Sequence, residues 1–260
     1  MKALLYDINL CIGCEACVDA CKEENGLPEE PRDRLSATSF TYLTDAGDDR
    51  YYRHLCMHCV EPSCASACPV GALQKTKEGP VTYEYDKCIG CRYCMVACPF
   101  SVPRYEWASN TPRVRKCEMC KQRTLKGGIT ACAEACPTEA TIFGDREELI
   151  ATAWKRISDD PDSYAPHVFG TEEVGGTCVL MIGPQKVLEA AVPGGLPDEA
   201  LPELTWRVME RIPAAVGIAG VSLLGINWII RRRMTLAAEN GVTAEHSNAA
   251  EKLGQEEDLR

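Results

Sequence analysis

The sequence predicts an α+β fold, in which short strands alternate with cysteine-rich loops and short helices, followed by one apolar helix. Three observations predict this fold. Sixteen of the seventeen cysteines fall into four groups of four between Cys11 and Cys136. Strand-like and turn-like segments flank these groups, so the chain repeats one small structural unit four times. Near the C-terminus, the nineteen residues from Ile212 to Ile230 carry no charge.

The spacing of the cysteines is typical of iron–sulfur ligation. Groups one and three have the C-x2-C-x2-C-x3-C spacing that holds [4Fe–4S] clusters. Groups two and four widen the middle gap but keep C-x2-C at the front and C-x3-C-Pro at the back. In chain order the groups are Cys11, Cys14, Cys17 and Cys21, then Cys56, Cys59, Cys64 and Cys68, then Cys88, Cys91, Cys94 and Cys98, then Cys117, Cys120, Cys132 and Cys136. Four thiolates per cluster predict four [4Fe–4S] clusters.

Two other uses of cysteine fit this pattern less well. Disulfide networks are typical of short secreted chains, whereas this chain has 260 residues and very tight cysteine repeats. Structural zinc sites use paired C-x2-C units without a third cysteine at the same spacing. Because only group four resembles half of a zinc site, iron–sulfur ligation is the prediction for the whole set.

The four repeats predict two bacterial-type ferredoxin units on one chain, because two strand–loop–helix–strand repeats make one such unit. In these ferredoxins the fourth cysteine of one motif ligates the cluster of the other motif. Groups two and three are close in sequence and would naturally pair, which leaves groups one and four as the second pair. The expected ligand sets are then Cys11/Cys14/Cys17/Cys136, Cys117/Cys120/Cys132/Cys21, Cys56/Cys59/Cys64/Cys98 and Cys88/Cys91/Cys94/Cys68. The spacing alone leaves open the alternative in which group one pairs with two and three with four.

We expect four parts along the chain. Residues 1–182 form the four-cluster domain, and residues 183–205 form a linker rich in Pro and Gly. Residues 206–233 form a transmembrane anchor helix, and residues 234–260 form a polar, disordered tail. Inside the first part, strands are expected at residues 2–9, 40–43, 70–73, 81–85 and 177–182, with a helix starting after Asp145.

The apolar segment has the properties of a single membrane span. Its nineteen residues would extend about 28 Å as a helix, close to the thickness of the hydrocarbon core. Trp206 and Trp228 lie near its ends, and three arginines follow it at 231–233. By the positive-inside rule, the C-terminus is then cytoplasmic and the cluster domain faces the periplasm or cell exterior. With no signal segment before Cys11, we expect export together with a signal-bearing partner.

The chain resembles the four-cluster iron–sulfur (beta) subunits of membrane-bound respiratory oxidoreductases. The resemblance lies in Cys-Met-His-Cys at 56–59, in the segments 88–99 and 143–149, and in Val-Gly-Gly-Thr at 174–177. It is similar to the beta subunit of formate dehydrogenase and to the iron–sulfur subunit of hydrogenases of the hydrogenase-2 type. The resemblance also implies that group one pairs with group four and group two with group three.

The function that this resemblance implies is electron transfer without catalysis by the chain itself. The expected partners are a catalytic large subunit with a molybdopterin, tungstopterin or NiFe site, a membrane cytochrome b or quinone-reactive subunit, and the lipid bilayer. The formal net charge of −10 gives no sign of nucleic-acid binding. Two alternatives remain, a free-standing membrane-anchored polyferredoxin and a zinc-stabilised scaffold. His58, between two cysteines of group two, is expected at most to tune a cluster by hydrogen bonding.

Overall fold

A three-stranded sheet organises the first part of the chain. The computed structural model describes the backbone of residues 1–257 and the side chains of residues 1–239. The central strand β1 (Lys2–Asp7) runs antiparallel to β8 (Thr141–Asp145) and parallel to β9 (Val179–Ile182). All residues of β1 after Lys2 are buried. Both faces of the strand are therefore covered, as its almost continuous apolar sequence requires.

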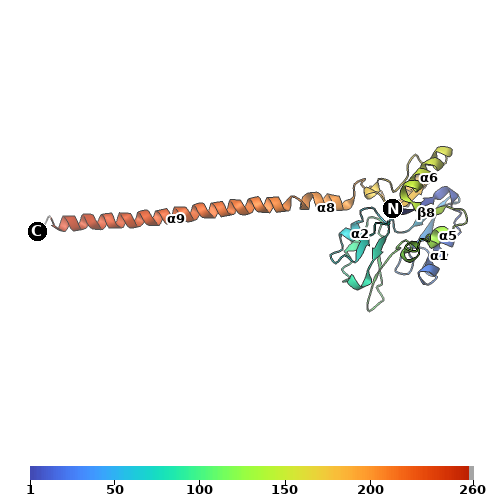
Figure 1. Ribbon diagram of the computed structural model, residues 1–260, viewed down its shortest axis with the longest axis horizontal. Helices are drawn as coiled ribbons and strands as arrows, with labels where there is room; N and C mark the ends of the chain where they lie inside the picture. Colours follow the sequence, from blue (N-terminus) through green and yellow to red (C-terminus); the bar gives the residue numbers. More distant parts are fainter. Residues whose placement is uncertain (258–260) are drawn as a thin grey trace. The chain divides into compact units, whose positions relative to one another are not determined.

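Helix α6 (Arg146–Asp159) packs on this sheet (Figure 1). Its buried side chains Leu149, Ala153 and Ile157 recur every four residues, which places them on one face of the helix. The expected helix start after Asp145 is confirmed, but the Asp145 carboxylate makes no capping hydrogen bond. It pairs instead with Lys2 on the neighbouring strand, at 2.9 Å.

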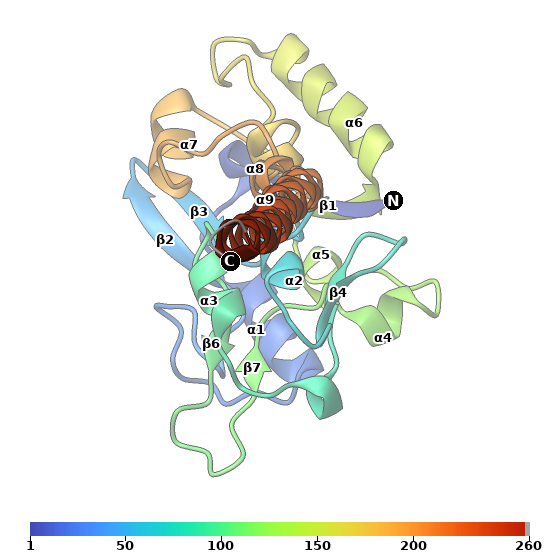
Figure 2. The ribbon, with the colours of Figure 1, turned by 90° about the vertical axis from the view of Figure 1, so that its left-hand side faces the viewer.

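A second layer carries the cysteines of groups one and four. Helices α1 (Ala16–Glu24) and α5 (Ala131–Glu134) pack against each other. The hairpin of β2 (Tyr42–Gly47) and β3 (Arg50–His54) lies in the polar segment for which the sequence predicts only one strand. Figure 2 shows this hairpin next to α7, which contacts β3.

Groups two and three lie in a region built of very short elements. Helices α2 (Ser63–Ser66) and α3 (Tyr93–Ala97) pack together, as α1 and α5 do. Strands β4 (Leu73–Lys75) and β5 (Val81–Tyr83) pair antiparallel, as β1 and β8 do.

The remaining short elements of the first part of the chain are β6 (Arg104–Tyr105), β7 (Val114–Arg115), α4 (Lys121–Thr124), and the 3-10 turns η1 (Ile8–Leu10), η2 (Tyr85–Lys87) and η3 (Glu173–Gly175).

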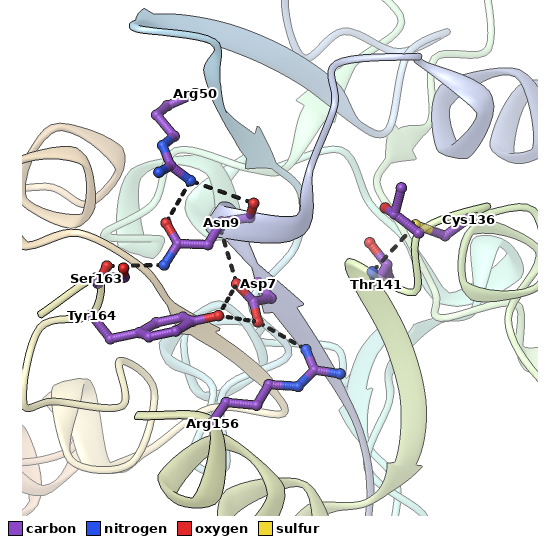
Figure 3. Close-up of polar contacts among 9 residues, drawn as sticks. Asp7, Asn9, Arg50, Cys136, Thr141, Arg156, Ser163 and Tyr164 are labelled. Atoms are coloured by element: carbon purple, nitrogen blue, oxygen red, sulfur yellow. Dashed lines mark hydrogen bonds and ion pairs between the residues drawn. The ribbon is translucent and has the colours of Figure 1, made fainter. Parts of the chain in front are cut away.

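A buried carboxylate fixes the segment that leads from β1 into the first cysteine group. Asp7 is fully buried, and its carboxylate accepts hydrogen bonds from Arg156 (2.9 Å), from the Tyr164 hydroxyl (3.0 Å) and from the backbone N–H of Asn9 (3.0 Å). The Asn9 side chain accepts a further bond from Arg50 (2.7 Å). These contacts join three parts of the chain that are distant in sequence, around residues 7–9, 50 and 156–164, as Figure 3 shows, and hold the chain just before Cys11.

The segment for which the sequence predicts a linker, 183–205, is largely packed onto the first part of the chain. It forms α7 (Gln185–Ala191), whose Leu188 is buried against the main core. The backbone N–H of Val174 donates to the carbonyl of Pro197 at 2.7 Å, and Ala200 is buried. The prolines of this segment therefore act as turn residues around a packed helix rather than as a free linker.

The chain divides after Leu204 into a second unit that is helical. Helices α8 (Leu201–Met209) and α9 (Ile212–Glu257) include the apolar segment, and its large apolar side chains are exposed. Within the described residues, 201–239 is the one helical stretch long and apolar enough to cross a membrane. The sequence predicts a disordered tail from 234, but α9 continues through Glu257, because Ala, Glu, Lys and Leu favour helix. Residues 258–260 of that tail lie outside the described part.

Candidate iron–sulfur sites

Two small cavities each gather four cysteines from two different groups. The first, which we call the Cys98 cavity, is lined by three thiols of group two and the last thiol of group three, namely Cys56, Cys59, Cys64 and Cys98. The second, which we call the Cys68 cavity, is lined by three thiols of group three and the last thiol of group two, namely Cys88, Cys91, Cys94 and Cys68. The fold thus brings each fourth cysteine to the neighbouring group.

The cysteines of groups one and four also lie close together, because α1 carries Cys17 and Cys21 while α5 carries Cys132. Four thiols surround Cys17 and Cys21 closely enough to act on them electrostatically, namely Cys11, Cys120, Cys132 and Cys136. Cys117 lies near Cys21, and desolvation together with the charge of Cys21 raises its pKa well above the usual value. Cys14 is the one exposed cysteine of the seventeen.

The loops of groups one and three have the same backbone geometry. Gly13 and Gly90 occupy the same place in the two Cys-Ile-Gly-Cys segments and have φ angles of +69° and +70°. A Cβ atom at Gly13 would lie 2.5 Å from the Tyr51 ring, and one at Gly90 would lie 2.8 Å from the Tyr105 hydroxyl. Both positions therefore require glycine, because of the left-handed conformation and the packed tyrosine.

The last cysteines of groups two and four also share a local geometry, in which the thiol accepts backbone hydrogen bonds. The Sγ atom of Cys68 accepts from the N–H of Ala72 at 3.2 Å, and that of Cys136 accepts from Thr141 at 3.4 Å (Figure 3). Burial opposes ionisation of Cys68, but the backbone N–H groups of residues 70–73 together lower its pKa. The turn after Cys68-Pro69 thus favours a thiolate at Cys68.

Most other cysteines of the sites are held in surroundings that disfavour a free thiolate. Burial is the main cause that raises the pKa of Cys21 and Cys64 to about 12 and that of Cys94 to about 11. Neighbouring thiolates raise these values further. The thiols are therefore protonated near neutral pH unless positive charge binds among them, and metal binding would release those protons.

Arg53 is a buried cation among the thiols of groups one and four that sequence reasoning missed. The residue is 4% exposed, and its guanidinium donates to Thr41 at 2.8 Å and to Thr141 at 3.4 Å. Burial opposes ionisation of Cys132, but the charge of Arg53 lowers its pKa below the usual value. The sequence signal was weak, since Arg53 lies in a polar segment, three residues before a cysteine.

Two polar side chains converge on Val81 beside the Cys98 cavity. The N–H of Val81 donates to Nδ1 of His58 at 2.9 Å, and its carbonyl accepts from the Lys116 ammonium. Both side chains line the cavity and are almost fully buried. The sequence places Lys116 in a basic run around group four, whereas the structure buries it. Burial, with the charges of Lys116 and Lys75, lowers the pKa of His58 well below its usual value, so the ring is neutral.

The donor sets fit iron–sulfur clusters better than single metal ions. A structural zinc ion needs four donors within about 2.3 Å of one point. Among the described residues, no three His, Cys, Asp or Glu side chains come together closely enough for a single ion. The cysteines of groups two and three instead line the Cys98 and Cys68 cavities. Beside the Cys98 cavity, the Nε2 atom of His58 is buried without a hydrogen-bond partner among the described residues. All-thiolate sets of four with this spacing are the ligands of [4Fe–4S] clusters.

Comparison with known proteins identifies the family. A 4Fe-4S dicluster domain model matches residues 48–146, and a 4Fe-4S binding domain model matches residues 8–25. The hydrogenase-2 operon protein HybA of Escherichia coli O157:H7 is 40% identical over 69% of this chain and 69% of its own length. The formate dehydrogenase iron–sulfur subunit of Haemophilus influenzae is 34% identical over 85% of this chain and 77% of its own length. The formate dehydrogenase-O iron–sulfur subunit of Escherichia coli K12 is 34% identical over 84% and 79%. The chain belongs to this family of 4Fe-4S iron–sulfur subunits that transfer electrons.

Proposed function

We propose that the chain binds four [4Fe–4S] clusters in two ferredoxin-like units with crossed ligation. Groups two and three form one unit, and groups one and four form the other. The proposed ligand sets are those expected from the sequence, with Cys98 and Cys68 exchanged in the first unit and Cys136 and Cys21 in the second. The observation that carries this proposal is that each of the two cavities takes three thiols from one group and the last thiol from the other.

The packing of the elements supports the same pairing. In each proposed unit two short helices that hold cysteines lie together, α2 with α3 and α1 with α5. In each unit an antiparallel strand pair accompanies the helices, β4 with β5 and β1 with β8. The cavities do not favour the alternative, since both are lined by cysteines of groups two and three rather than by cysteines of groups one and two or of groups three and four.

We propose further that the chain passes electrons singly between a catalytic subunit and a membrane subunit. A [4Fe–4S] cluster supplies reversible one-electron transfer. The protein residues insulate the cysteine sites, exclude water from them and fix their charge, as Arg53 and Lys116 do. By the names of its relatives, the catalytic partner is a hydrogenase or a formate dehydrogenase, with a NiFe or a molybdopterin or tungstopterin site. The membrane partner is a cytochrome b or quinone-reactive subunit.

Cysteine variants test the crossed ligation. Cys98→Ala and Cys59→Ala are expected to change the same cluster signal in the electron paramagnetic resonance (EPR) spectrum of the reduced protein. Cys91→Ala is expected to change a different signal, although Cys91 and Cys98 belong to the same sequence group. Cys178→Ala is the control, because Cys178 is buried immediately before β9 and outside every proposed set. If Cys98→Ala and Cys91→Ala altered one common signal, the exchange would be wrong.

We propose that the apolar part of α9 anchors the protein in the cell membrane as a single span. Its C-terminal end would be cytoplasmic, because the three arginines at 231–233 follow the span. External protease added to spheroplasts is then expected to digest the part that holds the cysteines and to leave a C-terminal epitope intact. An intact cysteine-bearing part in spheroplasts that are not lysed would contradict this orientation, and lysed spheroplasts provide the control for protease access.

A further inference from the structure

The Nε2 atom of His58 is buried and has no hydrogen-bond partner among the described residues. The ring is fully buried, and its Nδ1 atom accepts the N–H of Val81 at 2.9 Å. An accepting Nδ1 carries no proton, so the neutral ring carries its proton on Nε2. That Nε2–H group is buried and has no partner among the described residues. Leaving a buried donor unpaired is costly, so a partner outside the polypeptide is expected.

The position of His58 restricts what this partner can be. His58 lines the Cys98 cavity together with its four cysteines. Within residues 1–239, the two other buried side-chain atoms without partners, on Thr76 and Arg104, belong to residues that line neither cysteine cavity. The Nε2–H group is therefore the buried donor that this cysteine site leaves unsatisfied.

We infer that His58 donates a hydrogen bond from Nε2 to a sulfur atom of the cluster at the Cys98 cavity. This inference rests on the proposed ligation by Cys56, Cys59, Cys64 and Cys98. A hydrogen bond to sulfur stabilises the reduced state, which carries one more negative charge, and so raises the reduction potential. The positive charge of Lys116, which lines the same cavity, also raises the reduction potential. His58 thus makes this site easier to reduce than it would otherwise be.

Group four contains a residue, Met119, at the position that corresponds to His58 in group two. Met119 follows Cys117 by two residues, as His58 follows Cys56, and both have positive φ angles, of 55° and 48°. Both side chains are buried. Methionine therefore fits the backbone and the burial of this place in the loop but has no N–H group. His58→Met removes the hydrogen bond with a residue that the chain already uses at the equivalent position.

The test is a potentiometric titration of the full, detergent-solubilised chain, monitored by EPR. In His58→Met, one of the cluster signals is expected to become harder to reduce by about tenfold in the equilibrium constant, or about 59 mV for one electron. The other signals should keep their potentials. His58→Gln, which retains an N–H donor, should recover part of the shift. His54→Met is the matched control, because His54 stacks on Tyr42 and bonds to Thr44 away from both cysteine cavities.

The unmodified protein gives an independent test that does not depend on how a variant folds. With 15N-labelled histidine, electron–nuclear spectroscopy should detect nitrogen coupling at one cluster, together with a proton that exchanges in D2O. No such coupling at any cluster, or equal potentials in His58→Met and His54→Met, would overturn the inference. If the parent protein showed no cluster signals at all, the proposed function would fail rather than the role of His58.

Discussion

Replacing Arg53 with methionine is expected to destabilise the iron-loaded protein by about 3–5 kcal/mol, the usual cost of removing one partner from a buried charge pair. Arg53 is 4% exposed and is the buried cation beside Cys17, Cys21 and Cys132. Without it, the net negative charge that thiolate-ligated iron would leave among groups one and four would lose its closest buried counterion. The loss should appear as an earlier unfolding transition and as fewer iron atoms per chain.

Two further variants separate charge from packing at this position. Arg53→Lys retains the positive charge but lacks the planar fork that reaches both Thr41 and Thr141, so it should lie between the parent and Arg53→Met. Arg34→Met is the control for loss of an arginine, because Arg34 is exposed and pairs only with Asp33 on the surface. A surface pair of this kind contributes about 0–1 kcal/mol. Equal stability and iron content in Arg53→Met and Arg34→Met would contradict the assigned role.

The grouping of cysteines around the Cys98 and Cys68 cavities could be predicted from the sequence, because it follows from residue type and local spacing. The C-x2-C-x2-C loops of groups one and three have the same length, and the glycines at 13 and 90 are needed for the left-handed turn. The helix after Asp145 could be predicted from apolar residues at helical spacing, although one of these residues, Trp154, is 43% exposed. Local periodicity gives the approximate position of a helix but not the limits of its covered face.

The residues that set the charge around the sites could not be predicted in this way. Arg53 and Lys116 reach the thiols through contacts between segments distant in sequence, and in the sequence they look like ordinary charged residues. Helix α7 was missed for a related reason, since its prolines and glycines suggested a linker. Its stability comes from tertiary packing of Leu188 rather than from a helix signal. The spacing favours the pairing of groups two with three but leaves an alternative open, because the pairing depends on tertiary contacts between helices and strands.

The two cysteine regions differ in how much apolar core supports them. Around groups two and three, the buried cluster consists of Cys64, Leu73, Val81, Cys94 and Val114, so two of its five members are expected cluster ligands. Around the sheet of β1, β8 and β9, the buried cluster is several times larger and includes α6. A region with so few apolar residues cannot offset its conformational entropy without metal–ligand bonds.

Removal of iron is therefore expected to unfold the two regions unequally. After chelation under mild oxidation, followed by reduction of the thiols, amides of β4 and β5 should exchange with solvent at close to the rate of an unfolded chain. Amides of β1 and β9 should remain protected, because Leu5, Leu180 and Ile182 stay buried in the larger core. Hydrogen exchange measured by mass spectrometry compares the regions within one sample, so β1 and β9 are the internal control. Equal protection of both regions after iron loss would show that the second region has a self-sufficient core, and that its thiols are held in place before the metal arrives.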